Sequence, residues 1–444
     1  MADNIITLPS RRGSDTELTE DAVALVFTER FRNELRYCHG RQKWLVWDGN
    51  RWKVENTKLA FNWARETCRE LNTKDQKTIA RASTARAIEA YAQADRAFAV
   101  TSETWDRDRY LLATPDGTVD LREGKVRPAR REDHITLSTA VGPDFSAAHT
   151  EWTRFLRETT KGNEALMRFL QQIAGYALSG DISEHALFFI YGPGGNGKGV
   201  FISTISSILG EYAKTAPMET FVTSSFDKHP TELAMLNGAR LVTAQETEEG
   251  RAWAEARIKA LTGGDPITAR FMRQDFFTFE PQFKLIIIGN HKPKLNNVDE
   301  ANMRRFNIIP FLNKPEAKDT GLLEILRPEW PAILAWAVRG YADWRKNGLV
   351  RPEIVKKETQ KYFEDQDVVK AWIDQYCFCS PKVKSTKERL FASWSRFAGN
   401  ANEDPKDQKW LNATLERMGF APTRITAQGK DRYKRGFSGI EPGC

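Results

Sequence analysis

The sequence lacks the features that mark membrane proteins and proteins of oxidising compartments. No run of 18 or more apolar residues is present, so we expect no transmembrane helix. Residues 1–15 hold no apolar stretch that could act as a secretory signal. The five cysteines are few, odd in number and without a CxxC pair, which argues against a disulfide framework or a zinc site. A protein of the reducing cytoplasm fits these absences.

Internal repeats and low-complexity tracts are also missing. Positively and negatively charged residues are both abundant. The 444 residues include 66 Lys and Arg against 59 Asp and Glu, a net charge of +7. That sign favours a polyanion as partner, although a merely soluble basic surface explains it equally well. At about 100–200 residues per domain, the length suggests about two to four domains.

Apolar runs that alternate with helical segments indicate an α/β core. Alternating Trp and polar residues around Asp-Gly-Asn predict a hairpin at Trp44–Trp52. Further short strands are expected within 110–145, and helices within 20–100, 150–178, 200–209 and 330–344. Runs that are apolar throughout predict strands of a sheet covered on both faces, and they lie at 186–191, 239–244 and 284–288.

A glycine-rich segment connects the first of these strands to a helix. Anion binding at a helix N-terminus needs exposed backbone N–H groups that no side chain obstructs. The lysine that ends the segment, Lys198, adds a mobile positive charge for the β- and γ-phosphates of ATP. A structural turn is the alternative. Gly199 departs from the motif, since a Ser or Thr hydroxyl usually contacts Mg²⁺ there. The predicted nucleotide-binding residues are Gly192, Pro193, Gly194, Gly195, Asn196, Gly197, Lys198, Gly199 and Val200.

Polar residues at the ends of the other two strands complete a candidate catalytic set. Glu246 stands where a carboxylate for the metal and the attacking water belongs, with Glu248 as a second candidate. A solvated acidic loop is the alternative. Asn290, at the tip of the third strand, is suited to orient the water. Arg305, preceded by Arg304, is a candidate for an arginine that reaches the γ-phosphate from a neighbouring subunit. Taken alone, two such arginines in a loop are usually surface charge.

A second hairpin is expected between the second and third strands. Residues 267–279 alternate on both sides of Arg273, which would lie at the tip with Arg270 nearby. Cations beside aromatic rings suit single-stranded DNA. An ordinary hairpin with a charged turn is the alternative.

The C-terminal part, 351–444, is basic, with 18 Lys and Arg against 13 Asp and Glu. Two short helices around 390–394 and 410–415, followed by strands around 424–426 and 433–437, have the order of a winged helix. Phosphate contacts by such a wing give affinity without sequence readout, although winged helices also bind proteins. The wing would carry Arg424, Lys430, Arg432, Lys434 and Arg435.

Taken in order, these motifs resemble those of superfamily 3 helicases. The branch they resemble comprises phage and plasmid primase–helicases related to the poxvirus primase–helicase. The matching residues are Gly192–Lys198, Glu246–Glu248, Thr262–Asp265, Asn290 and Arg304–Arg305, with further matches at Gly175–Gly180, Ile333–Trp336, Trp44–Trp52 and Asp116–Arg127.

The resemblance implies an AAA+-like P-loop ATPase that forms a ring, commonly a hexamer, around DNA. It implies ATP and Mg²⁺ as cofactors, ATP bound between subunits, and 3′-to-5′ unwinding. By position, it makes Lys198 the phosphate lysine, Glu246 and Glu248 the acids, and Asn290 the sensor. It makes Arg305 the arginine that acts in trans, with Arg304 in reserve, and Arg273 the basic residue of the central-channel hairpin.

The expected architecture is α/β, with an ATPase core between two smaller domains. It comprises a disordered terminus (1–18), a mixed α+β pre-helicase domain (19–145), the ATPase domain (146–346) and a winged-helix-like domain (347–444). We expect no primase domain, because the chain begins almost at the pre-helicase domain. Asp106 and Asp108 could suggest a two-metal polymerase site, but a loop of alternating charge explains them better.

The leading functional hypothesis is a replicative DNA helicase of a phage, plasmid or other mobile element. Its expected partners are single-stranded DNA in the channel, duplex DNA at the fork, further copies of the chain, and a separate primase or host replication proteins. No membrane is expected. An origin-binding initiator or loader is a rival, because Gly199 weakens the expected Mg²⁺ contact. A packaging ATPase acting on duplex DNA is a third hypothesis.

Overall fold

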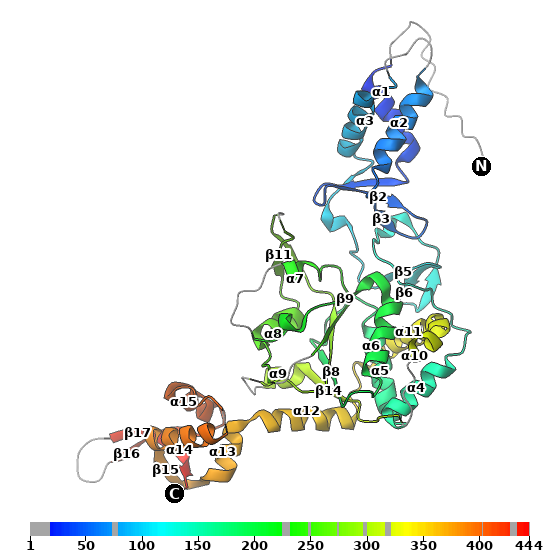
Figure 1. The fold of residues 1–444 in the computed structure, drawn as a ribbon. Coiled ribbons are helices and arrows are strands. Elements are labelled where there is room, and N and C mark those ends of the chain that lie inside the picture. The colour runs from blue at the N-terminus through cyan, green and yellow to red at the C-terminus, as the bar shows by residue number, and fades with distance from the viewer. Residues whose placement is uncertain are drawn as a thin grey trace.

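The computed structural model describes residues 18–72, 79–223, 231–246, 250–272, 275–295, 300–315, 321–401, 403–426 and 433–443. Three units follow one another along the chain: an N-terminal unit, a central α/β unit, and a C-terminal unit reached through one helix (Figure 1). Apart from Leu18, the terminus predicted to be disordered lies outside these residues. Within them, no helix is both long and apolar enough to cross a membrane.

The N-terminal unit combines helices with two small sheets. Leu35 and Trp44 pack with Phe98 against the helices, while Cys38 and Trp52 belong to a separate cluster. The predicted hairpin is confirmed, because β2 and β3 pair antiparallel. The helices are α1 (Glu20–Phe31), α2 (Leu59–Leu71) and α3 (Ala82–Ala94), and the first sheet has the order β3-β2-β1-β4. Its strands are β1 (Leu35–Cys38), β2 (Lys43–Trp47), β3 (Trp52–Val54) and β4 (Ala99–Val100); the second sheet is β5 (Leu111–Thr114), β6 (Gly117–Asp120) and β7 (Lys125–Arg127).

The central unit is built on a five-stranded parallel sheet with the order β14-β8-β13-β10-β9. Side chains of β8 alternate between two cores: Phe188 and Ile190 enter one, and Leu187 and Phe189 enter the other. The predicted sheet with both faces covered is therefore confirmed. Its strands are β8 (Leu187–Tyr191), β9 (Ala213–Thr215), β10 (Leu241–Gln245), β13 (Lys284–Gly289) and β14 (Phe306–Pro310). Sequence patterns predicted three of these strands and missed β9 and β14.

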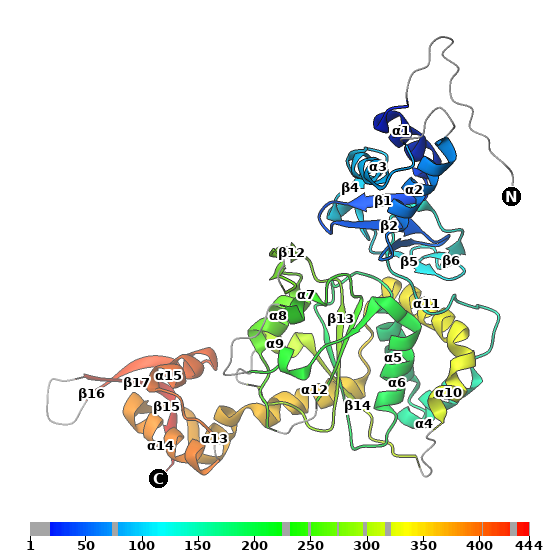
Figure 2. The ribbon, with the colours of Figure 1, turned by 45° about the horizontal axis from the view of Figure 1, so that its top comes forward.

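Helices cover both faces of this sheet (Figures 1 and 2). Helices α5 (Glu164–Tyr176) and α11 (Trp330–Asn347) approach closely, since a Cβ on Gly175 would lie 2.1 Å from the backbone nitrogen of Tyr341. A Cβ on Gly340 would likewise lie 2.2 Å from the carbonyl oxygen of Gln171, so both positions require glycine. One core contains residues of α4 (Thr150–Thr160), α5 (Glu164–Tyr176), α6 (Lys198–Leu209), α10 (Leu322–Leu326) and α11 (Trp330–Asn347). The other contains residues of α7 (Thr231–Ala234), α8 (Glu255–Gly263), α9 (Glu300–Arg305) and α12 (Glu353–Gln366).

The hairpin predicted between the second and third strands is also confirmed. Strands β11 (Ile267–Ala269) and β12 (Phe277–Phe279) pair antiparallel, with Ile267 opposite Phe279. In Figure 2 it projects from the central unit beside α7. Arg273, predicted at its tip, lies outside the described residues.

The C-terminal unit has its own core, which includes Trp372, Trp394, Leu411 and Phe437. Both helices and both strands expected from the sequence are present, and the structure adds α13 and β15. The unit comprises α13 (Val368–Tyr376), β15 (Cys377–Thr386), α14 (Lys387–Asn400), α15 (Gln408–Arg417), β16 (Ala421–Thr426) and β17 (Tyr433–Pro442), with the sheet order β15-β17-β16. Its assignment as a winged helix stays a prediction.

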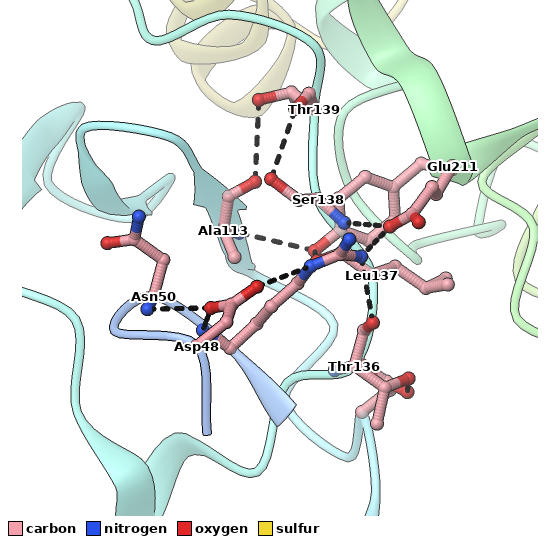
Figure 3. Close-up of polar contacts among 11 residues, drawn as sticks. Asp48, Asn50, Ala113, Thr136, Leu137, Ser138, Thr139 and Glu211 are labelled. Atoms are coloured by element: carbon pink, nitrogen blue, oxygen red, sulfur yellow. Dashed lines mark hydrogen bonds and ion pairs between the residues drawn. The ribbon is translucent and has the colours of Figure 1, made fainter. Parts of the chain in front are cut away.

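A polar joint links the N-terminal unit to the residues that follow α6 (Figure 3). Arg51 forms an ion pair with Glu211 and donates to the carbonyl of Thr136 at 3.1 Å. The backbone nitrogen of Ser138 donates to Glu211 at 3.0 Å. The Tyr212 hydroxyl accepts from Ala113 and donates to the carbonyl of Leu137 at 2.9 Å. The far end of α6 is thereby fixed to the preceding unit.

The side chains of Asp106 and Asp108 both contact other residues of the N-terminal unit. Asp106 accepts from the backbone nitrogen of Thr136 at 2.7 Å, and Asp108 pairs with Arg122. Among the described residues, no group of three or more His, Cys, Asp or Glu side chains is placed to hold a metal ion. Each of these two carboxylates thus has a protein partner.

Candidate functional site

The glycine-rich loop connects β8 directly to α6. Its glycines pack closely against Phe311 and Phe155. A Cβ on Gly192 would lie 2.0 Å from the carbonyl oxygen of Phe311, and one on Gly197 would lie 2.8 Å from the Phe155 ring. Gly197 also has a φ of +85°, which disfavours other residues. Asn196 is buried and donates to that same Phe311 carbonyl. The intervening Pro193-Gly194-Gly195 is exposed, so its backbone faces solvent.

Lys198 begins α6 and folds back into this loop. Its ammonium nitrogen lies 2.6 Å from the carbonyl oxygen of Gly192 and 3.1 Å from the side-chain oxygens of both Asn196 and Asn290. The side chain is 7% exposed, and burial lowers the pKa of the ammonium group. These oxygen acceptors are neutral. An anionic phosphate would therefore be a stronger partner for the charge than the contacts it makes here.

Glu246 and Asn290 lie at the same edge of the sheet as the loop. Strand β13 lies between β8 and β10, so Asn290, after β13, stands between the loop and Glu246, after β10. The Glu246 carboxylate is buried and accepts from the backbone nitrogen of His291 at 3.3 Å. Ligands of open α/β sheets bind at this carboxyl edge. The structure thus brings together three of the residues that the sequence singled out; Glu248 lies outside the described residues.

Gly289 is a site residue that sequence reasoning missed. A Cβ there would lie 2.7 Å from the carboxylate oxygen Oε2 of Glu246 and 2.8 Å from the Phe189 ring. Its glycine identity lets the Glu246 carboxylate lie against the end of β13. The signal was the Gly-Asn pair at the end of an apolar run, of which only the asparagine was interpreted.

Arg304 and Arg305 do not join this set within one chain. They end α9 and directly precede β14, instead of lying in a loop. Because Phe306 pairs in parallel with Leu187, the first residue of β8, both arginines lie at the edge of the sheet opposite the loop. The five-residue strand β14 separates the two edges by about 16 Å. Arg304 is exposed, and Arg305 is half-buried and donates a hydrogen bond to the carbonyl of Ala301.

Cations and aromatic rings are exposed together on the β11–β12 hairpin. The guanidinium of Arg270 lies 4.7 Å from the centre of the Phe276 ring, and the rings of Phe271 and Phe277 stack at 5.7 Å. Met272 is 71% exposed and Phe276 60% exposed. Exposed apolar and cationic side chains thus lie together on this hairpin.

The predicted wing presents opposed positive charges. Arg424 on β16 lies directly across from Arg435 on β17, and both are exposed together with Lys434. Like charges directly opposite each other destabilise a sheet, and a bound anion would relieve that cost. Lys430 and Arg432 lie outside the described residues.

Two family models match separate parts of the chain. Residues 24–161 match a family described as D5 N terminal like, and residues 190–305 match a family of unknown function, DUF5906. A protein of Acanthamoeba polyphaga mimivirus named "Putative helicase L207/L206" is 28% identical over 313 residues, which is 64% of this chain and 32% of that protein. "Putative helicase 121R" of Invertebrate iridescent virus 3 is 24% identical over 229 residues, 49% of this chain and 24% of that protein.

The predicted resemblance to the primase–helicase family is confirmed. The chain spans about a third or less of the length of these curated relatives. Its fold is also similar to that of the apo C-terminal region of NrS-1, with a TM-score of 0.54, 12% identity, and coverage of 96% of this chain and 100% of that one. This chain therefore shares its mixed α/β fold with that solved structure.

Proposed function

We propose that the protein is an ATP-dependent DNA helicase that translocates 3′-to-5′ as a ring during replication of a phage, plasmid or other mobile element. The observation that carries this proposal is the convergence of Lys198, Asn290 and Glu246 at one edge of the parallel sheet. An exposed glycine loop at a helix N-terminus suits a triphosphate, and the names of the viral relatives support a helicase.

In this proposal, each side chain has a distinct role in hydrolysis. Lys198 holds the β- and γ-phosphates, Asn290 orients the attacking water, and Glu246 polarises that water. Glu246 is also the described carboxylate that would hold Mg²⁺, together with the phosphates and water, since Gly199 offers no hydroxyl. When bound, Mg²⁺ neutralises charge on the phosphates.

The position of Arg304 and Arg305 supports a ring. At the opposite edge of the sheet they are badly placed to reach a phosphate on Lys198 of their own chain. They could instead complete the site of a neighbouring copy, with Arg305 as first candidate. An arginine supplied in trans accelerates phosphoryl transfer by roughly 10³–10⁵. The hairpin with Arg270 and the basic wing would then contact single-stranded and duplex DNA.

The proposal is tested by DNA-stimulated ATPase and strand displacement. Lys198→Ala should abolish both activities, whereas Lys346→Ala, which removes an exposed lysine from α11, should leave both intact. Comparing single-stranded with duplex DNA as the stimulant separates a helicase from a packaging ATPase. A wild-type protein that hydrolyses no ATP under any DNA condition would rule out the motor.

One observation favours an initiator or loader as a second candidate. A Cβ on Gly199 would meet nothing within 4 Å, so the place of the usual hydroxyl is open space. Weak metal contact there would leave ATP binding intact but slow hydrolysis. The discriminating result is a ring, counted by native mass, that assembles with ATP on DNA but separates no strands.

A further inference from the structure

The segment that follows Asn290 runs along one face of α12. The ammonium of Lys292 lies 3.4 Å from the Glu358 carboxylate, and the backbone nitrogen of Leu295 donates to Gln366 at 3.1 Å. Between these two contacts, the Tyr362 hydroxyl donates to the carbonyl of Pro293. Three consecutive contacts thus fix the chain immediately after the candidate sensor.

The spacing of these contacts shows that the segment lies extended beside the helix. Their partners on α12, Glu358, Tyr362 and Gln366, are four residues apart and share one helical face. The eight residue steps from Glu358 to Gln366 rise about 12 Å along the helix, and the three residue steps from Lys292 to Leu295 span about 10 Å when extended. The two paths match in length and direction.

Glu358 also contacts the strand that carries the glycine loop. Its Oε2 atom accepts from the Tyr191 hydroxyl at 2.5 Å, and Tyr191 is the last residue of β8. The Lys292 ammonium lies 4.0 Å from the centre of the same tyrosine ring. Burial and the neighbouring carboxylate raise the pKa of Tyr191, so its hydroxyl remains a donor to Glu358. One carboxylate therefore joins the ends of β8 and β13.

Helix α12 is in turn the connection to the C-terminal unit (Figure 1). Thr359 accepts from the backbone nitrogen of Ile308 at 3.0 Å, and the Tyr362 hydroxyl accepts from buried Trp253 at 2.9 Å, so the helix is fixed to the central unit. Lys294, in the segment after Asn290, pairs with Glu403 of the C-terminal unit at 2.7 Å.

We propose that α12 is a positioning element for Asn290, that Glu358, Tyr362 and Gln366 are its positioning residues, and that it couples the nucleotide site to the C-terminal unit. This inference rests on the proposed function, because it takes Asn290 as the residue that orients the attacking water. A misplacement of about 1 Å at a reacting group can cost about 10²-fold in rate. Small shifts of α12 would therefore change the rate of hydrolysis. In the other direction, nucleotide binding would change how α12 holds the C-terminal unit.

The first test is kinetic. Glu358→Gln keeps a hydrogen-bond acceptor for Tyr191 but loses the ion pair with Lys292, and Gln366→Ala releases Leu295. Each should lower kcat by roughly tenfold, within the range for coupled groups in contact, with little change in the affinity for ATP. In an Asn290→Ala background the same changes should have almost no further effect.

The matched control is Glu364→Gln, which alters an exposed carboxylate on the same helix. It should behave as wild type, with or without Asn290. If the effects of Glu358→Gln and Asn290→Ala simply multiply, or if the Glu358 and Gln366 variants match the control, then α12 does not position Asn290.

The second test does not depend on hydrolysis. Binding of a non-hydrolysable ATP analogue should slow hydrogen exchange at Leu295 and along α12 in the wild type, and Glu358→Ala should abolish the effect on α12. A wild type without ATPase activity would refute the motor, yet this exchange pattern would still support the coupling. Unchanged exchange along α12 on analogue binding would overturn it.

Discussion

The ammonium nitrogen of Lys198 lies 3.1 Å from the side-chain oxygen of Asn290, 92 residues further along the chain. The first residue of α6 and the residue after β13 thus share a hydrogen bond. A triphosphate would draw the ammonium toward itself and release the asparagine to a water molecule. In the proposed function, this one contact would couple nucleotide binding to the arrangement of the attacking water.

The first prediction concerns Asn290→Ala. Removing the amide should lower kcat for ATP by about 10²-fold, the cost of a misplaced reacting group. The affinity for ATP should change little, because Lys198 and the loop remain. Steady-state ATPase assays and equilibrium binding of a fluorescent ATP analogue measure the two effects separately. A large loss of affinity at unchanged kcat would mean that Asn290 holds the nucleotide instead.

A second prediction follows from the buried state of Lys198. Burial lowers its pKa below the ordinary value of 10.5, while bound phosphates would raise it again. Between the free and bound pKa values, ATP binding must take up a proton, so ATP affinity should fall as pH rises through that window. Isothermal titration in buffers of different ionisation enthalpy counts the protons. No proton uptake at alkaline pH would contradict a direct contact between Lys198 and phosphate.

The lowered pKa of Lys198 also predicts how the free energy of unfolding depends on pH. A lysine with a lowered folded pKa leaves the unfolded chain binding more protons between that pKa and 10.5. The free energy of unfolding should therefore rise with pH in this window. Lys198→Met should lose that contribution, which denaturant titrations at several pH values would detect.

A third prediction uses the open space beside Gly199. Gly199→Thr should restore a hydroxyl next to Lys198 without a clash, since a Cβ there meets nothing within 4 Å. We expect a lower Mg²⁺ requirement for ATPase activity. Gly199→Ala is the matched control, because replacing glycine within α6 stabilises a helix by up to about 1 kcal/mol without supplying a ligand. Equal Mg²⁺ dependence in the two variants would show that the metal is held elsewhere.

The elements that sequence reasoning recovered are those with local signatures. The glycine loop and the strands ending near Glu246 and Asn290 are contiguous patterns, an apolar run followed by a polar tip. Strand β14 was missed because Asn307 interrupts its apolar run. The structure explains that residue by tertiary partners, since Asn307 donates to the carbonyl of Leu187 and accepts from Arg351 at 2.6 Å.

Contacts between distant segments could not be predicted from the sequence either, because they too depend on tertiary structure. Lys292 and Glu358 are 66 residues apart, and neither lies in a motif. Their pairing depends on how α12 crosses the end of the sheet, which periodicity cannot specify. Arg304 and Arg305 were recognised, but their position at the opposite edge follows only from the parallel register of β14 with β8.

A fourth prediction concerns Arg240, a fully buried cation at the start of β10. Its guanidinium donates to the carbonyls of Leu111 in the N-terminal unit and Leu178 in the central unit, and lies 4.5 Å from the centre of the Tyr212 ring. Arg240→Met would leave both carbonyls unsatisfied, at a cost of about 2–5 kcal/mol.

Denaturant unfolding followed by several probes would measure this loss, because a chain of several units need not unfold in one step. Arg327→Met is the control, since that arginine is 65% exposed and its loss should cost less than about 0.5 kcal/mol. Similar unfolding curves for the two variants would show that Arg240 does not fasten the N-terminal unit.

The last prediction separates a DNA-binding wing from a merely basic surface. Arg424 and Arg435 face each other across β16 and β17, so each destabilises the other in the absence of an anion. Arg424→Ala and Arg435→Ala should weaken duplex binding and reduce the slope of log affinity against log salt by about 0.9 for each phosphate that is no longer neutralised. Neither should lower the melting temperature, because a repulsion is removed. Lys370→Ala, an exposed lysine of the same unit, should change neither property. Fluorescence anisotropy over a salt series measures the slope, and unchanged slopes would show that the two arginines form a merely basic surface that does not contact DNA.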